Sequence, residues 1–351
     1  MDKFESQNNH LFAVYENTTG NMYFWLPGKF GLSFFYQYHP SSGWRRLSTL
    51  WLVLVKNMIV SEGKLYYTLY EQWDPTGHKS YLYSLDLKTC RTTALLQKDS
   101  LSDIYAAGNG KLLIHLLGYK GDQHKAGIYY YSVDNQQLSS VWWHDYAEVK
   151  YGEKGISLKK TVDDTWKYYD YNTETVFETG FSGQGCLSAD IFSKTHWQTL
   201  RLNPYVYSIY LNGNIVQQID GHHRITMNES YEIWYDKNEG KQTIHVMDVH
   251  SSENNPQLVE YEVSVYSNIF ILSHFAVMMS DVKTATLTLI DLSTGEMEQI
   301  SPRMNTAFSF SHNSEHFLSP LFNDQDIRRA EQVLNTGKNI TAGRNIIHSF
   351  D

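Results

Sequence analysis

The sequence predicts an all-β protein with the β-propeller fold, built from seven four-stranded blades, with six or eight blades as alternatives. A hairpin pattern recurs along the chain at intervals of 36 to 49 residues, and a period of this length is typical of propellers. Helix signals are almost absent before residue 320. The 351 residues include 26 Tyr, 16 Phe and 9 Trp, bulky side chains that fill the space between stacked sheets. Length alone favours two domains, but a closed ring of blades forms one.

The clearest copy of the hairpin is residues 286–300, TLTLIDLSTGEMEQI. Residues 286–292 are apolar or β-branched and predict a strand, and Gly295 supplies the positive φ that a tight turn requires. Residues 296–300 then return as a shorter, more polar strand that faces water. Asp291 precedes the turn, where its carboxylate can accept backbone N–H groups that the turn leaves unpaired. We therefore interpret this Asp as a turn residue.

The same arrangement marks the other repeats. Each mark follows the third strand of its blade, so ring symmetry places all five Asp marks on one face. The marks are Asp86, Asp134, Asp170, Asp248 and Asp291, with Gln37 and Tyr210 in two degenerate copies.

Each repeat has room for four strands, which run from an inner strand to an outer one. Between residues 91 and 140, three strand candidates at 104–107, 112–117 and 128–133 follow the outer strand of the preceding blade at Leu95-Leu96. Asn109-Gly110 separates two of them as a hairpin turn. Near-continuous apolar runs are expected here because a sheet between two other sheets is buried on both faces.

The chain ends leave two ways of closing the ring. Strand candidates at 11–15 and 22–26 precede the first mark. Two more candidates, 306–311 and 316–321, flank His312-Asn313-Ser314. These last two either complete the first blade or begin an eighth.

One helix is expected, at the C-terminus. Asn323 is suited to cap it, and Ile327, Ala330, Val333 and Leu334 fall on one face before Gly337 stops it. We therefore expect a propeller domain over residues 1–321. Residues 322–351 form a helix and tail that pack on this domain or extend from it.

Composition limits the partners and the compartment. The net charge is −9, with 29 basic and 38 acidic residues and no Lys/Arg cluster, which argues against nucleic acid and anionic membranes. The N-terminus lacks a signal-peptide pattern. The most apolar window, residues 50–60, is too short to span a bilayer and is interrupted by Lys56. These features predict a soluble protein that is cytoplasmic or is exported without a cleaved signal. We expect the propeller to be monomeric.

The two cysteines, Cys90 and Cys186, are predicted to be free thiols. Cys90 follows a third strand, whereas Cys186 lies near a crossing from one blade to the next. These connections lie on opposite faces of a propeller, farther apart than a disulfide can bridge.

The working surface is predicted from connection lengths. In a propeller, the connections between second and third strands share one face with the crossings between blades. Most of these connections are short, but QWDPTGHK at 72–79 and GYKGDQHK at 118–125 are long and belong to consecutive blades. Aromatic side chains on such loops commonly anchor interfaces, although neutral insertions would look the same. The binding candidates on this rim are Trp73, Asp74, His78, Tyr119, Lys120, Asp122 and His124.

A second candidate location is the crossing that contains His222 and His223, at the mouth of the central channel. Adjacent side chains of a strand point to opposite sides, so these two imidazoles cannot ligate one metal unless the backbone bends. Other crossings carry groups capable of acid–base chemistry, although charged residues also solvate ordinary loops. These groups are Asp99, Asp103, His144, Asp145, Glu260, Glu262 and Arg303.

Two literal motifs do not predict catalysis. The sequence from His312 to His316 matches H-x-x-E-H, but that zinc motif requires a helix and this one lies in turn context. Residues 180–185, GFSGQG, lack the second Gly of a nucleophile elbow, since Gln184 replaces it. No metal, no cofactor and no catalytic residue is therefore predicted.

The hairpins at 81–89, 243–251 and 286–295 resemble bacterial propeller repeats of the broad TolB-like and YWTD-like group. The resemblance spans residues 10–300 at the level of the repeat. It implies a propeller fold and the binding of proteins, peptides or sugars at one face, and it transfers no catalytic residue.

The function predicted from the sequence is a non-catalytic scaffold that binds a protein, a peptide or another ligand through one loop face. One alternative is a hydrolase or lyase with a His/carboxylate site at the channel mouth. A second alternative is a carbohydrate-recognition module with exposed aromatic rings, in which the bound small molecule is a sugar.

Overall fold

The structure, a computed structural model, is all-β over the residues that it describes. The described residues are 13–27, 32–51, 53–71, 80–98, 101–117, 126–143, 146–151, 155–160, 165–171, 173–182, 197–203, 206–211, 214–220, 224–227, 230–235, 240–248, 257–263, 269–281, 286–300, 309–310 and 317–318.

Each sheet uses consecutive strands paired antiparallel in chain order. The first sheet contains β1 (Ala13–Glu16), β2 (Asn21–Pro27), β3 (Leu32–His39) and β4 (Gly43–Trp51). The second contains β5 (Val53–Ser61), β6 (Lys64–Glu71), β7 (Ser80–Asp86) and β8 (Thr92–Lys98). The third contains β9 (Leu101–Gly108), β10 (Lys111–Leu116), β11 (Gly127–Ser132) and β12 (Gln137–Trp143).

The fourth sheet contains β13 (Tyr146–Tyr151), β14 (Gly155–Lys160), β15 (Thr165–Asp170) and β16 (Thr175–Ser182). The fifth has three described strands, β17 (Trp197–Asn203), β18 (Val206–Leu211) and β19 (Asn214–Asp220). The sixth contains β20 (Arg224–Met227), β21 (Tyr231–Tyr235), β22 (Gly240–Asp248) and β23 (Gln257–Val263). The seventh contains β24 (Ile269–Leu272), β25 (Phe275–Asp281), β26 (Thr286–Asp291) and β27 (Met297–Ile300).

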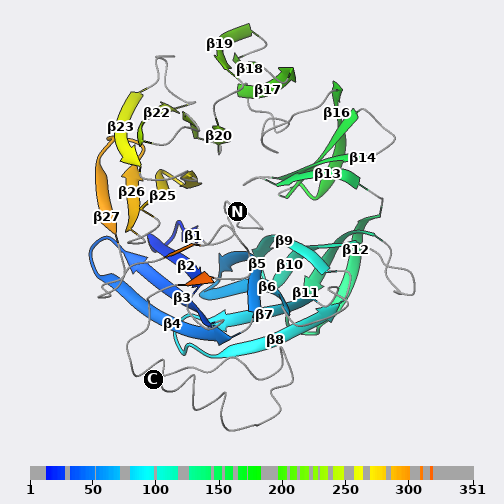
Figure 1. The fold of residues 1–351 in the computed structure, drawn as a ribbon. Helices are drawn as coiled ribbons and strands as arrows, with labels where there is room; N and C mark the ends of the chain where they lie inside the picture. The colour runs from blue at the N-terminus through cyan, green and yellow to red at the C-terminus, as the bar shows by residue number, and fades with distance from the viewer. Residues whose placement is uncertain are drawn as a thin grey trace.

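The sheets follow one another around a common centre (Figure 1). First strands such as β5, β9, β13 and β20 lie toward the middle, and last strands such as β4, β8, β12 and β23 lie outside. First strands of neighbouring sheets are in contact, as β1 is with β5 and β5 with β9. This arrangement confirms the prediction of an all-β, propeller-like fold.

The ring closes by side-chain packing between the first and seventh sheets. One buried cluster contains Phe24 and Tyr36 from the first sheet with Val277 and Leu289 from the seventh, and β1 contacts β24. All four strands of the first sheet come from residues 13–51. The alternative in which the chain end completes this sheet is therefore wrong.

Instead, β28 (Ser309–Phe310) and β29 (Phe317–Leu318) pair with each other as a separate two-stranded sheet. The helix expected within residues 322–351 lies outside the described residues.

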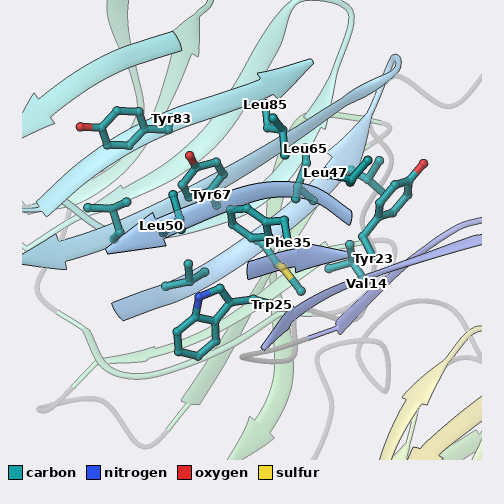
Figure 2. Close-up of a cluster of buried hydrophobic side chains, with 14 of the residues drawn as sticks. Val14, Tyr23, Trp25, Phe35, Leu47, Leu50, Leu65, Tyr67, Tyr83 and Leu85 are labelled. Carbon is teal, nitrogen blue, oxygen red and sulfur yellow. The ribbon is translucent and has the colours of Figure 1, made fainter. Parts of the chain in front are cut away.

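Buried aromatic and aliphatic side chains fill the space between neighbouring sheets. Figure 2 shows this between the first sheet and the second, where Phe35 and Tyr67 lie with their ring centroids 4.7 Å apart. Tyr67 in turn stacks on Tyr83 at 5.7 Å. Such aromatic pairs stabilise a core beyond the effect of their buried area. The aromatic excess in the sequence therefore serves packing at this interface.

A bulge recurs in the outer strands of the first three sheets. Register shifts leave Leu47, Leu95 and Val141 as the extra residues in β4, β8 and β12. Each extra side chain joins the apolar cluster between its own sheet and the next. A bulge increases local twist and redirects a side chain. Here it supplies packing where the sheets diverge at the rim.

Successive antiparallel strands alternate in direction, so their connections alternate between two edges of the ring. The turn edge is the edge that carries the connections between first and second strands and between third and fourth strands. The loop edge is the opposite edge, which carries the connections between second and third strands and the crossings between sheets.

The Asp marks are turn residues, as predicted. Asp86 Oδ1 accepts hydrogen bonds from Lys88 N at 3.1 Å, Thr89 N at 2.7 Å and Thr89 Oγ1 at 2.8 Å. Asp291 Oδ1 accepts three equivalent bonds from Ser293 and Thr294. All five Asp marks end a third strand or lie in the turn that follows it, which places them on the turn edge.

In the third sheet, the residue equivalent to the other marks lies two positions before the one that the sequence pattern predicted. The residue four positions after a true mark has positive φ, as at Cys90 (56°) and Gly295 (77°). In the third sheet this residue is Gln136 (56°), so Ser132 is the equivalent of Asp86. Asp134 therefore lies within the turn rather than before it.

A hydrogen bond between the two turns of a sheet supports the new register. Leu87 N donates to Gly63 O at 3.0 Å, and Val133 N donates to Gly110 O at 2.9 Å. Leu87 directly follows Asp86 and Val133 directly follows Ser132. The sequence pattern missed Ser132 because a nearby Asp is a stronger signal than a Ser.

The first sheet needs the same correction. Gly43, with φ 76°, lies four residues after His39, so His39 replaces Gln37 as the mark. His39 Nδ1 accepts a hydrogen bond from Ser41 N at 3.1 Å. The imidazole therefore takes the place of the Asp carboxylate.

Tyrosine hydroxyls and carboxylates meet across neighbouring sheets at the turn edge. Burial, together with the charges of Glu62 and Asp134, raises the pKa of Tyr66 to about 12. Burial also raises the pKa of Tyr130 to about 12, against the effect of its hydrogen bond with the Tyr169 hydroxyl. Contacts of this kind link the second sheet to the third and the third to the fourth at the turn edge.

Cys90 is a free, half-buried thiol, as predicted. Its sulfur lies 3.4 Å from Arg45 Nη2, and Cys186 lies outside the described residues. In the part of the chain that the structure describes, no helix is long and apolar enough to cross a membrane.

Candidate functional site

The loop edge carries two long connections on neighbouring sheets. The chain between β6 and β7 comprises residues 72–79, and the chain between β10 and β11 comprises residues 117–126. In the four other sheets that have four described strands, the equivalent connection has four residues, as at 28–31 in the first. The strand bounds thus confirm the predicted difference in connection length.

All nine predicted binding residues lie outside the described residues. They are Trp73, Asp74, His78, Tyr119, Lys120, Asp122, His124, His222 and His223. The topology nevertheless places their segments. Residues 72–79 and 118–125 leave adjacent sheets, whereas residues 221–223 form the crossing from the fifth sheet to the sixth. The two predicted locations are therefore on different parts of the ring.

A buried histidine is paired with an aspartate in the third sheet, close to the loop edge. His115 is the next-to-last residue of β10, pairs in register with Asp103 of β9, and is 8% exposed. Its ring stacks on Tyr105 with centroids 5.8 Å apart. Leu116, the next residue, ends β10, and the long connection 117–126 follows it. The pair therefore lies at the base of one predicted loop.

Burial controls the charge of His115. Removal from water lowers the pKa of the imidazole to about 4, with a further lowering by Lys56, while Asp103 acts in the opposite direction. The ring is consequently neutral at pH 7 and has one N–H donor and one acceptor nitrogen.

Lys56 reaches this neighbourhood from the second sheet. It is the extra residue of a bulge in β5, because Val55 pairs with Leu69 and Asn57 with Thr68. Tyr105 is likewise the extra residue of a bulge in β9, between Ile104 and Ala106. The two first strands are in contact. Bulges are frequent next to functional sites, since they redirect side chains.

These residues supply a cation, a carboxylate and a neutral imidazole within two adjacent sheets. Such a set can bind a polar ligand through charge and hydrogen bonds, and it can also transfer a proton. Among the described residues, no group of three or more His, Cys, Asp or Glu side chains could hold a metal ion.

The sequence pattern identified Asp103 as a carboxylate near a crossing, but it missed His115 and Lys56. A signal was present for both. His115 interrupts the apolar run LLIHLL, and Lys56 interrupts LVLVKNMIV. A polar residue inside a buried strand requires a partner or a function, which periodicity alone does not reveal.

Neither protein-family models nor curated proteins match the sequence. Solved structures do match the fold. A post-proline cleaving enzyme from Rickettsia typhi aligns with a TM-score of 0.57 at 8% identity, over 86% of this chain and 54% of the enzyme. A prolyl endopeptidase aligns with a TM-score of 0.55 at 10% identity, over 87% and 51%. The acylaminoacyl peptidase of Pyrococcus horikoshii gives 0.52 at 9% identity, over 86% and 53%.

The likeness is one of fold. The chain spans about half the length of each of these three enzymes, and at such identities no residue role is transferred. The resemblance to bacterial propeller repeats is thus supported at the level of a propeller-like, all-β architecture.

Proposed function

We propose that this protein is a binding scaffold that recognises a protein or peptide through the loop edge of its second and third sheets. The observation that carries the proposal is the coincidence of two features in the same sheets. The two longest connections between second and third strands leave adjacent sheets, and the buried His115, paired in register with Asp103, lies at the base of one of them. The binding residues in this proposal are those of the rim, with Trp73 and Tyr119 as its aromatic anchors.

The opposite edge is a poorer candidate. Its turns are held by backbone N–H groups that donate hydrogen bonds to the Asp86 and Asp291 carboxylates, and by bonds between neighbouring turns. Polar groups engaged in this way are less available to a partner. In this proposal, residues 1–321 act as one closed domain and residues 322–351 add a C-terminal helix and tail.

The test compares two double variants in quantitative affinity capture, followed by titration calorimetry with the purified partner. Trp73→Ala with Tyr119→Ala should weaken binding at least tenfold, since aromatic anchors contribute upwards of about 2 kcal/mol at interface hot spots. The matched control, Lys88→Ala with Gln136→Ala, changes exposed residues of the turn edge and should bind like the parent protein. Thermal unfolding should be almost unaltered in both.

Unchanged binding by a folded Trp73→Ala/Tyr119→Ala protein would move the site away from the rim, first to the crossing that holds His222 and His223. A large loss of stability would show that these rings are packing residues, and the rim would then be rejected as the binding surface.

A second candidate function is supported by the His115–Asp103 pair itself. A carboxylate beside a buried imidazole suits general acid–base catalysis of hydrolysis or elimination. Purified protein would be screened against ester, peptide and uronide substrates, with His115→Gln as the control. Turnover that disappears in a folded His115→Gln protein would favour the enzyme. Turnover that persists, or its absence from the parent protein, would count against this pair as a catalytic site.

A further inference from the structure

Two polar side chains face each other inside the interface between the second and third sheets. Asn57 of β5 and Thr68 of β6 are opposite one another in the antiparallel register. Asn57 is 3% exposed and Thr68 is fully buried. Both lie on the face that carries Ile59 and Leu82, which belong to the apolar cluster shared with the third sheet.

Within the described part of the chain, neither Asn57 Oδ1 nor Thr68 Oγ1 has a hydrogen-bond partner. Enclosing a carbonyl and a hydroxyl among aliphatic side chains without partners is costly, and native structures usually satisfy such groups with protein or with ordered water. Ile59, Leu82 and Ile104, which belong to the same cluster, offer no polar side-chain group. A bound molecule that both donates and accepts would satisfy the two groups.

The register limits the size of that molecule. Opposite side chains of an antiparallel pair have Cβ atoms roughly 4.5–5.5 Å apart, and one hydrogen bond between oxygens spans about 2.8 Å. One water molecule can therefore join both side chains, donating to the Asn57 carbonyl and accepting from the Thr68 hydroxyl. The bulge at Lys56, directly before Asn57, bends the strand and disrupts the ladder at this point.

We propose that Asn57 and Thr68 form a buried binding site for a single bridging water molecule between the second and third sheets. Buried waters of this kind make two to four hydrogen bonds with otherwise unsatisfied groups and are part of the folded structure. The inference is independent of the proposed binding function, because it concerns an internal site.

A high-resolution crystal structure of the full chain tests the site directly. A density peak within hydrogen-bond distance of both Asn57 Oδ1 and Thr68 Oγ1 supports the proposal. An empty space, or protein groups that bond both atoms, overturns it.

The substitution Thr68→Val provides a second test. A bridging water and a dry site predict opposite changes of the unfolding midpoint in this variant. It removes the hydroxyl while keeping the side-chain shape. If a water bridges the pair, the variant loses a hydrogen bond and its unfolding midpoint falls by about 2 °C relative to a matched Thr288→Val control. Thr288 is also buried, at 6% exposure, in a third strand of another sheet.

If the site is dry, Thr68→Val removes an unsatisfied buried hydroxyl and the midpoint rises relative to the same control. A rise overturns the proposal. If Thr68→Val fails to fold, the density at the unmodified pair decides.

Discussion

Glu62 Oε1 accepts a hydrogen bond from Asn109 N at 2.7 Å, which joins the first turn of the second sheet to the first turn of the third. Glu62 Oε2 lies 3.3 Å from Gly110 N and accepts a second bond. Glu62 has φ 52°, a conformation that Gly or Asn adopts at lower cost. A Glu at this position is explained by its bonds to the neighbouring sheet.

Glu62→Ala should lower the free energy of unfolding by about 1 kcal/mol, because two backbone N–H groups lose their charged acceptor and exchange it for water. Chemical denaturation would measure the change. Gln136→Ala is the matched control, since Gln136 is also exposed with φ 56°, and it should change stability by less than about 0.5 kcal/mol. Equal effects of the two substitutions would show that the bond between sheets contributes nothing measurable.

The corrected turn register makes a different pair of Asp substitutions informative. Asp86→Ala should cost about 1 kcal/mol, comparable to the loss of a helix cap, because three hydrogen bonds to Oδ1 disappear. Asp134→Ala should stay within about 0.5 kcal/mol, because Asp134 is an exposed residue inside its turn. Urea titrations of the two variants would compare them. If Asp134→Ala proved the more damaging, Ser132 would not be the true equivalent of Asp86.

Gly155 is the tightest glycine position described. A Cβ atom at Gly155 would overlap the Tyr168 ring and the carbonyl oxygen of Tyr169. Gly155→Ala should therefore destabilise the protein by about 2–4 kcal/mol through overpacking, seen as a marked fall in the thermal midpoint.

Gly63→Ala is the control for Gly155→Ala. Gly63 has φ 71° and open space around its Cβ position, so only conformational strain of about 1 kcal/mol is expected. A smaller loss at Gly155 than at Gly63 would mean that the fourth sheet relaxes around the added methyl group.

The buried His115 predicts that the free energy of unfolding depends on pH in the mildly acidic range. The folded imidazole has a pKa of about 4, against 6.5 in the unfolded chain, so the unfolded state binds the proton first as pH falls. Its contribution to stability is complete above pH 6.5 and is lost between pH 6.5 and 4, amounting to roughly 3 kcal/mol.

The variant His115→Phe keeps an aromatic ring against Tyr105 and cannot titrate. Its unfolding free energy should run parallel to that of the parent protein above pH 7 and fall less steeply below pH 6.5. Equal slopes in the acidic range would refute the neutral, buried imidazole.

The repeat determined the secondary structure of this protein from sequence alone. Hairpins such as residues 286–300 contain a strand of apolar and β-branched residues, a turn residue and a returning polar strand, all coded by neighbouring residues. Local rules of this kind specify β26, β27 and the bonds of Asp291, because the interacting groups lie within a few positions of one another. Connection length is local as well, so the two long segments of the loop edge could be read from the chain.

The tertiary structure decided the features that depend on distant residues. The alignment of Ser132 with Asp86 rests on φ values and on bonds to another turn, and a nearby Asp134 concealed it. Closure of the ring by the first and seventh sheets joins residues more than two hundred positions apart.

The candidate site also combines a feature that the local sequence indicates with features that only the tertiary structure decides. Asp103 could be suspected from its position near a crossing, but its pairing with His115 depends on the register of β9 and β10, which two bulges in β9 alter. The depressed pKa of His115 arises mainly from burial by the neighbouring parts of the fold. Burial is the sum of many contacts between segments far apart in the chain, and no local pattern specifies that sum.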